Sequence, residues 1–259
     1  NHFLINFFYN MPPKNKNKIS RQELSLNGLM GELKRLRNSS KTIVLQRFFK
    51  TGSGQYGEGD IFWGLNVPDC RRLAKKYTGL KMTDIVTLLK SKIHEIRLTA
   101  LLIMVEHYQI ANNLGEKRKI VNIYLKNTRY INNWDIVDLS VYKILGDYLV
   151  LSGEERKFLD KLVISKNLWE RRLAMVATYA FIKAGREEIA YQIAEKLLGD
   201  KHDLMHKAVG WMLREAGKRG DSLKLRQFLD KHIGKMPRTT LRYAIERFPE
   251  KNRQAYLKK

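Results

Sequence analysis

Residues 94–104 read HEIRLTALLIM, and the pattern around Ala100, a small residue followed by an apolar one on a helical face, returns along the chain. It recurs in NWDIVDLSV (133–141), WERRLAMVAT (169–178), MHKAVGWML (205–213) and TLRYAIERF (240–248). The anchor residues are Ala100, Val137, Ala174, Ala208 and Ala244, which stand 37, 37, 34 and 36 residues apart. That period is typical of a helix pair. The spacing predicts an α-solenoid, in which stacked helix pairs leave a concave groove.

The segments between the anchors also have helical spacing. Apolar residues recur at i, i+3, i+4 and i+7, as in Ile85, Leu88 and Leu89, and only five prolines occur in the chain. The breaks often contain a glycine at the end of a periodic stretch, as at Gly153 and Gly185, which is typical of helix ends. We therefore expect an all-α protein whose repeats are most similar in length to HEAT or armadillo units.

Composition sets the domain organisation. Hydrophobic residues make up 44% of the 259 residues, enough for a folded core, and no Pro/Ser-rich linker divides the chain. We expect one HEAT-like domain over residues 19–259, with an N-terminal helical cap at 19–80 and repeats from about 81 to 259. Residues 1–18 are expected to be an extension, disordered or non-native, without fold information.

Charge is the strongest compositional signal. The chain has 49 Lys and Arg against 26 Asp and Glu, a net charge of +23, which predicts a polyanionic partner: nucleic acid or an anionic membrane surface. The single Cys70 excludes an internal disulfide and fits a reducing compartment. The apolar start, Phe3 to Phe8, is too short to span a bilayer. We expect a cytoplasmic, nucleoid-associated or nuclear protein, and a basic groove that can follow a duplex.

One repeat departs from the pattern in two places. The position after the anchor is apolar in four of the five repeats, where it holds Leu101, Met175, Val209 and Ile245. In the second repeat along the chain the same position holds Asp138. A buried, unpaired carboxylate is costly. One helical turn earlier this repeat has Trp134, where the others have Arg97, Arg171, Met205 and Leu241. Either Trp134 fills a gap between repeats and Asp138 pairs with a nearby Lys or Arg, or the two form a site.

These segments resemble the AlkD-like DNA alkylation repair glycosylases, a family of HEAT-like solenoid enzymes. The resemblance covers about residues 45–250: FFKTGSGQYGEGDIFWGLNVPDCRRLAKKY (48–77) is similar to the family's N-terminal loop and following helix. In NNWDIVDLS, Trp134 and Asp138 match the cleft tryptophan and the catalytic aspartate. In KAVGWMLRE, Trp211 matches the second cleft tryptophan.

The resemblance also implies residues that contact DNA. In LWERRLAM, Arg172 matches an arginine along the DNA backbone near the lesion, and a one-residue slip would exchange it with Arg171. Arg214 is expected to make an additional contact with the DNA backbone, and Lys207 is expected to bind DNA as well. Such contacts would fix register without reading sequence. The implied partner is double-stranded DNA with alkylated bases, bound by a monomer that needs neither cofactor nor metal.

The chemistry suits a carboxylate. A purine alkylated at a ring nitrogen is cationic, so it leaves as a neutral base without a general acid. The enzyme must stabilise the oxocarbenium-like sugar and position water, and Asp138 suits both tasks. Trp134 and Trp211 would offer π-faces to the sugar and the cationic base, each worth roughly 0.5–2 kcal/mol. The alternative is a non-catalytic solenoid that binds nucleic acid or a protein partner through the same groove.

Other motifs are weaker. Residues 52–57, GSGQYG, match G-x-G-x-x-G but follow no strand, so we interpret residues 56–60 as a flexible loop rather than a nucleotide site. His202 and His206 have the spacing of a metal pair but lack Glu or Cys partners, which favours a surface or DNA-facing pair. The motifs contain no lysine suited to Schiff-base chemistry, so strand cleavage is not expected.

Overall fold

Residues 24–259 are described by the computed structural model, and they form helices joined by turns and loops. No β-strand forms among them, although an isolated β-bridge joins Ile61 to Ile93. The prediction of an all-α protein is therefore confirmed. In this part of the chain, no helix is both long and apolar enough to cross a membrane. The predicted extension at residues 1–18 lies outside the described residues.

The chain divides into two compact units, and the boundary falls between Ile110 and Ala111. The first unit contains the predicted cap together with the first repeat anchor, Ala100, and the second contains the other four anchors. The division thus lies about 30 residues beyond the end of the predicted cap at residue 80. The grouping of residues 19–259 into one domain stays a prediction.

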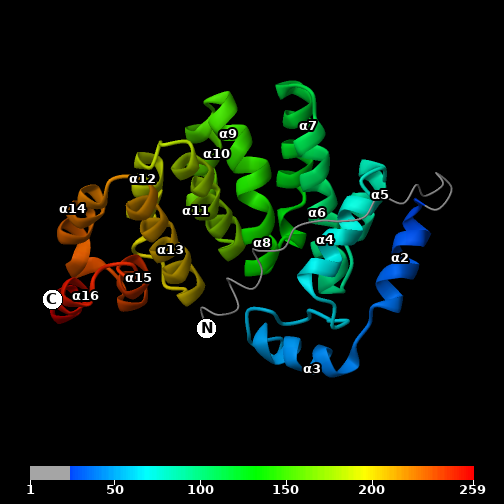
Figure 1. Cartoon of the computed structure of the whole chain (residues 1–259), viewed down its shortest axis with the longest axis horizontal. Coiled ribbons are helices and arrows are strands. Elements are labelled where there is room, and N and C mark those ends of the chain that lie inside the picture. Colours follow the sequence, from blue (N-terminus) through cyan, green and yellow to red (C-terminus); the bar gives the residue numbers. More distant parts are fainter. Residues whose placement is uncertain (1–23) are drawn as a thin grey trace. The chain divides into compact units, whose positions relative to one another are not determined.

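The described part of the first unit, residues 24–110, is built around its last and longest helix. Its helices are α2 (Leu26–Arg35), α3 (Ser39–Phe48), α4 (Val67–Lys76), α5 (Met82–Leu89) and α6 (His94–Ile110). Both α4 and α5 pack against α6 (Figure 1). Helix α4 begins at the Val-Pro-Asp segment, where Pro68 lies in the first turn and the Asn66 side chain accepts a hydrogen bond from the Asp69 amide.

The second unit continues as stacked helix pairs. Its elements are α7 (Leu114–Lys126), η2 (Thr128–Tyr130), α8 (Trp134–Val141), η3 (Tyr142–Gly146), α9 (Asp147–Ser152), α10 (Glu155–Val163), α11 (Leu168–Lys183), α12 (Glu188–Leu197), α13 (Asp203–Arg219), α14 (Ser222–His232), η4 (Ile233–Lys235), α15 (Arg238–Ala244) and α16 (Glu250–Lys258). Helices α8, α11, α13 and α15, here called the anchor helices, pack in succession (Figure 1). Helices α10, α12 and α14 each pack against a neighbouring anchor helix, which is the arrangement of an α-solenoid.

The repeat anchors explain this stacking. All five are buried: Ala100 on α6 in the first unit, and Val137, Ala174, Ala208 and Ala244 on the anchor helices of the second. Small side chains at these positions let neighbouring helices approach closely. Two of the predicted helix ends are confirmed as well, because Gly153 and Gly185 adopt φ of 69° and 74°, the left-handed conformation that glycine tolerates best.

Two glycines permit still closer contacts with an anchor helix. Gly146 ends η3, a π-helical turn between α8 and α9, and a Cβ there would lie 2.5 Å from the Ala177 carbonyl oxygen on α11. A Cβ at Gly210 on α13 would lie 2.5 Å from the Thr240 carbonyl oxygen on α15. Any side chain at either position would force the helices apart. These contacts fix how the helix faces that carry the candidate site meet.

Candidate active site

Asp138 lies in the middle of α8, which begins at Trp134 because the Asn133 side chain accepts the Trp134 amide at 2.8 Å. Only 8% of Asp138 is exposed. The equivalent positions in the other repeats, Leu101, Met175, Val209 and Ile245, are at most 1% exposed. The structure therefore confirms that this repeat position is buried, and that in one repeat it holds a carboxylate.

The Asp138 carboxylate is paired with one arginine through both of its oxygens. Arg172 on α11 donates from Nε to Oδ1 at 2.9 Å and from Nη2 to Oδ2 at 2.7 Å. Its Nη1 donates to the Leu204 carbonyl oxygen at 2.5 Å. Such a bidentate pair fixes both the position and the plane of the carboxylate. The sequence left two interpretations of Asp138 open: pairing with a nearby Lys or Arg, or forming a site with Trp134. The geometry shows the pairing and is also compatible with a site.

The groups around Asp138 have opposing effects on the pKa of its carboxyl. Burial raises the pKa of its carboxyl above the ordinary value for aspartate, and the nearby Asp135 carboxylate raises the pKa further. Arg172 lowers the same pKa through its charge and its hydrogen bonds. Burial is the largest of these effects, so the pair with Arg172 is what favours the charged form of the carboxylate in this setting.

Two half-buried tryptophans belong to the same unit. Trp134 precedes Asp138 by one turn of α8, and Trp211 lies on α13 directly after Gly210. The Trp211 ring lies 6.3 Å from the Tyr179 ring on α11, and the Tyr179 ring lies 5.2 Å from the ring of Tyr142. Tyr142 follows Asp138 by four residues. The structure thus connects Asp138 to Trp211 through two tyrosines.

We call Tyr142, Tyr179 and Trp211 the aromatic row. The sequence interpretation missed both tyrosines, although a signal was present: they stand 37 residues apart, the same step that separates Val137 from Ala174. Each follows its anchor by five residues, so the repeat alignment places them at equivalent positions.

The two predicted DNA-binding arginines on α11 both have protein partners. Arg171 donates from Nε to Oδ2 of Asp200 at 2.5 Å and from Nη1 to the carbonyl oxygens of Ser165 and Lys166, both at 3.0 Å. Arg172 is 4% exposed and is committed to Asp138 and Leu204, as described above. For both arginines, contact with a DNA phosphate stays a prediction.

The other two predicted cations lie on α13. Arg214 is buried between two carboxylates, with Nη1 at 2.5 Å from Glu246 and Nη2 at 3.1 Å from Glu215. Lys207 pairs with Asp203 one turn earlier at 2.6 Å, and its side chain is 39% exposed. Lys207 is therefore the most accessible of the four, and all four contacts with DNA stay predictions.

The weaker motifs have local structural roles. His202 accepts the Leu204 amide through Nδ1 and so caps α13, while His206 Nε2 lies 2.5 Å from the Asp200 carbonyl oxygen. Within the glycine-rich loop, the Gly52 and Gly54 amides donate to the loop's own Gln55 and Glu58 side chains. The described residues contain no group of three or more His, Cys, Asp or Glu side chains that could hold a metal ion.

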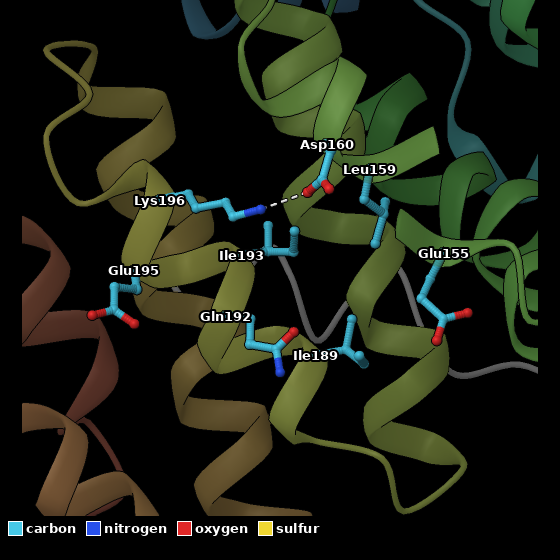
Figure 2. Close-up of a pocket in the computed structure, with 8 residues that line it drawn as sticks. All are labelled: Glu155, Leu159, Asp160, Ile189, Gln192, Ile193, Glu195 and Lys196. Carbon is cyan, nitrogen blue, oxygen red and sulfur yellow. Dashed lines mark hydrogen bonds and ion pairs between the residues drawn. The ribbon is translucent and has the colours of Figure 1, made fainter. Parts of the chain in front are cut away.

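A groove of about 460 Å³ lies on a different part of the second unit, between α10 and α12. Figure 2 shows its side chains, which include Ile189, Ile193 and the ion pair between Asp160 and Lys196 at 2.5 Å. None of the candidate site residues lines it. The groove therefore gives no support to the candidate site.

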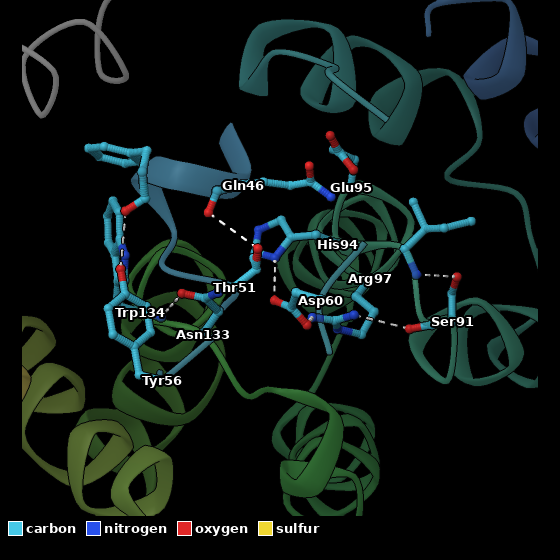
Figure 3. A network of polar contacts seen from close by, with 12 residues as sticks. Gln46, Thr51, Tyr56, Asp60, Ser91, His94, Glu95, Arg97, Asn133 and Trp134 are labelled. Atoms are coloured by element: carbon cyan, nitrogen blue, oxygen red, sulfur yellow. Dashed lines mark hydrogen bonds and ion pairs between the residues drawn. The ribbon is translucent and has the colours of Figure 1, made fainter. Parts of the chain in front are cut away.

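The first unit contains a second buried aspartate–arginine pair. Asp60 Oδ1 accepts from Arg97 Nη2 at 2.7 Å, and its Oδ2 lies 3.1 Å from His94 Nδ1 (Figure 3). The His94 ring stacks on Phe62 at 4.5 Å. Asp60 is the last residue of the loop predicted to be flexible, and this prediction is wrong at that end because three buried side chains anchor it to α6.

Comparison with known proteins adds a family and a fold. A family model described as "DNA alkylation repair enzyme" matches residues 29–248. A solved structure described as "Predicted DNA alkylation repair enzyme from Enterococcus faecalis" superimposes with a TM-score of 0.65 at 15% sequence identity, over 83% of this chain and 97% of that one. At that identity the likeness shows the fold alone. No curated protein matches the chain.

Proposed function

Because this chain belongs to the DNA alkylation repair enzyme family, we propose that it is a monofunctional DNA glycosylase of base excision repair. Its substrates would be cationic alkylated purines such as 3-methyladenine and 7-methylguanine in duplex DNA. The observation that carries the proposal is Asp138, a carboxylate held by Arg172 at a repeat position that is otherwise apolar. Trp134, one turn away, supplies a half-buried aromatic surface beside it.

The reaction needs an anion more than it needs an acid. A cationic purine already carries the positive charge that makes it a good leaving group, and the charge moves to the sugar as the glycosidic bond breaks. A carboxylate near the sugar stabilises that charge and can orient the attacking water. Asp138 would do both in its ionised form, while Trp134 and Trp211 would place their π-faces against cationic groups.

In this proposal Arg172 is a positioning residue for Asp138. By holding both carboxylate oxygens it limits rotation of the side chain, and its positive charge favours the ionised carboxylate against the effect of burial. A phosphate contact by Arg172 would have to use the guanidinium N–H groups that Asp138 and Leu204 leave over. The DNA backbone would otherwise be held by Lys207 and by further cations of the net +23 charge.

The test is direct. Purified protein is incubated with methylated duplex DNA, and released bases are measured by chromatography against a sample without protein. We expect release of 3-methyladenine and 7-methylguanine above the spontaneous rate, with no strand breaks until alkali is added. Release at the spontaneous rate would overturn the proposal and favour the non-catalytic solenoid. Strand breaks without alkali would contradict the monofunctional assignment.

A further inference from the structure

The aromatic row has a cation beside each of its tyrosines. Arg219 lies over the Tyr179 ring at 5.5 Å from the ring centroid, and its Nη2 donates to the Tyr179 hydroxyl at 3.0 Å. Lys143 Nζ lies 5.6 Å from the centroid of the Tyr142 ring. Both tyrosines and Trp211 are half-buried, so each ring keeps some accessible surface. The row therefore combines accessible aromatic surface with nearby positive charge.

The position of Arg219 is fixed by a chain of ion pairs on α13. Its Nε lies 3.6 Å from Glu215, and Glu215 also accepts from Arg214, which in turn pairs with Glu246. The Arg219 side chain remains 43% exposed despite these contacts. Its guanidinium is thus held next to Tyr179 and can still reach a ligand in solvent.

The charges of Lys143 and Arg219 determine which kind of base can bind to these rings. A cationic alkylated base placed on Tyr142 or Tyr179 would be repelled by Lys143 or Arg219, whereas a neutral base would not. Proteins hold unpaired nucleic acid by stacking bases on aromatic side chains while cations neutralise the adjacent phosphates. A base inside a regular duplex has both faces covered by its neighbours, so only an unstacked base can offer a face to these rings.

We propose that the two tyrosines of the aromatic row bind an unstacked, undamaged nucleotide, with its base against Tyr179 and Tyr142 and its phosphate at Arg219. The inference rests on the proposed function in taking DNA as the ligand. It extends the site beyond Asp138 along Tyr142 and Tyr179 toward Trp211, and assigns those tyrosines to the strand rather than to the reaction. The protein would accordingly prefer DNA in which one nucleotide is already unstacked.

The experiment uses undamaged DNA, so that no chemistry is involved. Fluorescence anisotropy compares a fully paired duplex with the same duplex carrying a single-nucleotide bulge. We expect the wild-type chain to bind the bulged duplex more tightly, by about fivefold or more if one base stacks. Tyr179→Leu should abolish this preference, and Tyr179→Phe should keep it because the ring remains.

Matched controls come from α12 and from the turn that precedes it. Tyr191 on α12 is also half-buried and its ring lies 5.4 Å from Phe228, so Tyr191→Leu should leave the bulge preference unchanged. Arg186 pairs with Glu155 and lies 5.1 Å from the centroid of the Phe181 ring, with a side chain 37% exposed. Arg219→Gln should weaken binding and reduce the slope of log Kd against log salt by about one, whereas Arg186→Gln should change neither.

The outcomes separate this inference from the proposed function. A Tyr179→Leu variant that keeps the bulge preference, or a Tyr179→Phe variant that loses it equally, would overturn the inference. Should Tyr179→Leu unfold, Tyr142→Leu provides the same test with the same expected loss. If the wild-type chain releases alkylated bases but shows no bulge preference, the inference fails and the glycosylase proposal stands. If the wild-type chain shows a bulge preference that depends on Tyr179 but releases no alkylated base, the inference stands and the glycosylase proposal fails.

Discussion

Two buried aspartate–arginine pairs, one in each unit, look alike and differ in their surroundings. Asp60 in the first unit pairs with Arg97 at 2.7 Å, and Asp138 in the second pairs with Arg172 at 2.9 and 2.7 Å. Asp60 divides its two oxygens between Arg97 and His94, both on α6. Asp138 gives both oxygens to a single partner.

The neighbouring rings make the larger difference. Around Asp60 the ring of His94, the Phe62 ring that stacks on it and the Phe49 ring that lies tilted against it are all buried, so no ligand can reach them. On either side of Asp138, one turn away, Trp134 and Tyr142 are only half-buried. A buried aspartate–arginine pair is therefore not in itself a sign of catalysis. Accessible aromatic surface beside the carboxylate is what distinguishes the candidate site from the structural pair.

The largest effect is expected from Asp138→Asn. Loss of the negative charge should reduce base release on the order of 10³-fold, since the charge that stabilises the sugar disappears while the shape remains. Binding to undamaged duplex should stay near the wild-type value, as measured by anisotropy. Asp200→Asn is the matched control, because it removes the carboxylate partner of Arg171 in the same unit and should release bases normally. Equal loss in both variants would contradict a special role for Asp138.

Asp60→Asn, like Asp138→Asn, removes one charge of a buried ion pair and should lower stability, but it should leave base release intact. Removing one member of a buried ion pair leaves the other charge uncompensated, so we expect the free energy of unfolding to fall by about 3 kcal/mol. Urea denaturation measures this change, and base release per folded molecule should remain close to wild type. A variant of normal stability with impaired release would show that Asp60 belongs to the chemistry and would remove the contrast between the two pairs.

The smallest effect concerns pH. Asp138 has a raised pKa, so base release should decline as the pH falls through a value above the ordinary pKa of aspartate, since protonation removes the charge. Asp135 contributes to that increase, and Asp135→Asn should lower the pKa of Asp138 and move the decline to more acidic pH. The exposed Asp147, which pairs with Lys117 at 3.7 Å, provides the control variant Asp147→Asn with an unchanged profile. A shift toward higher pH in Asp135→Asn would reverse the assigned sign.

Much of the architecture was predictable because it depends on local pattern. The anchors and the helices that bear them follow from spacing, and the Asp138 exception follows from comparing repeats. The partners were not predictable, because they come from residues distant in sequence. Arg97 and Arg171 occupy the repeat position of Trp134, and each donates to the backbone of the preceding turn, at Ser91 and Ser165, and to an aspartate. The ordinary role of that position is thus structural, which a single sequence did not reveal.

The π-helical turn η3 has a consequence for the phase of the helix that runs through the site. A π-turn holds about one residue more than an α-turn, so everything after Gly146 is rotated by about 100° relative to an uninterrupted α-helix. Tyr148 and Leu149, which follow the turn, are both buried in the core. Deleting one residue from the turn would leave the orientation of Trp134 and Asp138 on α8 unchanged, but it would rotate the buried side of α9 toward solvent. The extra residue of the π-turn therefore lets the face that carries the candidate site and the packing face of α9 be oriented separately.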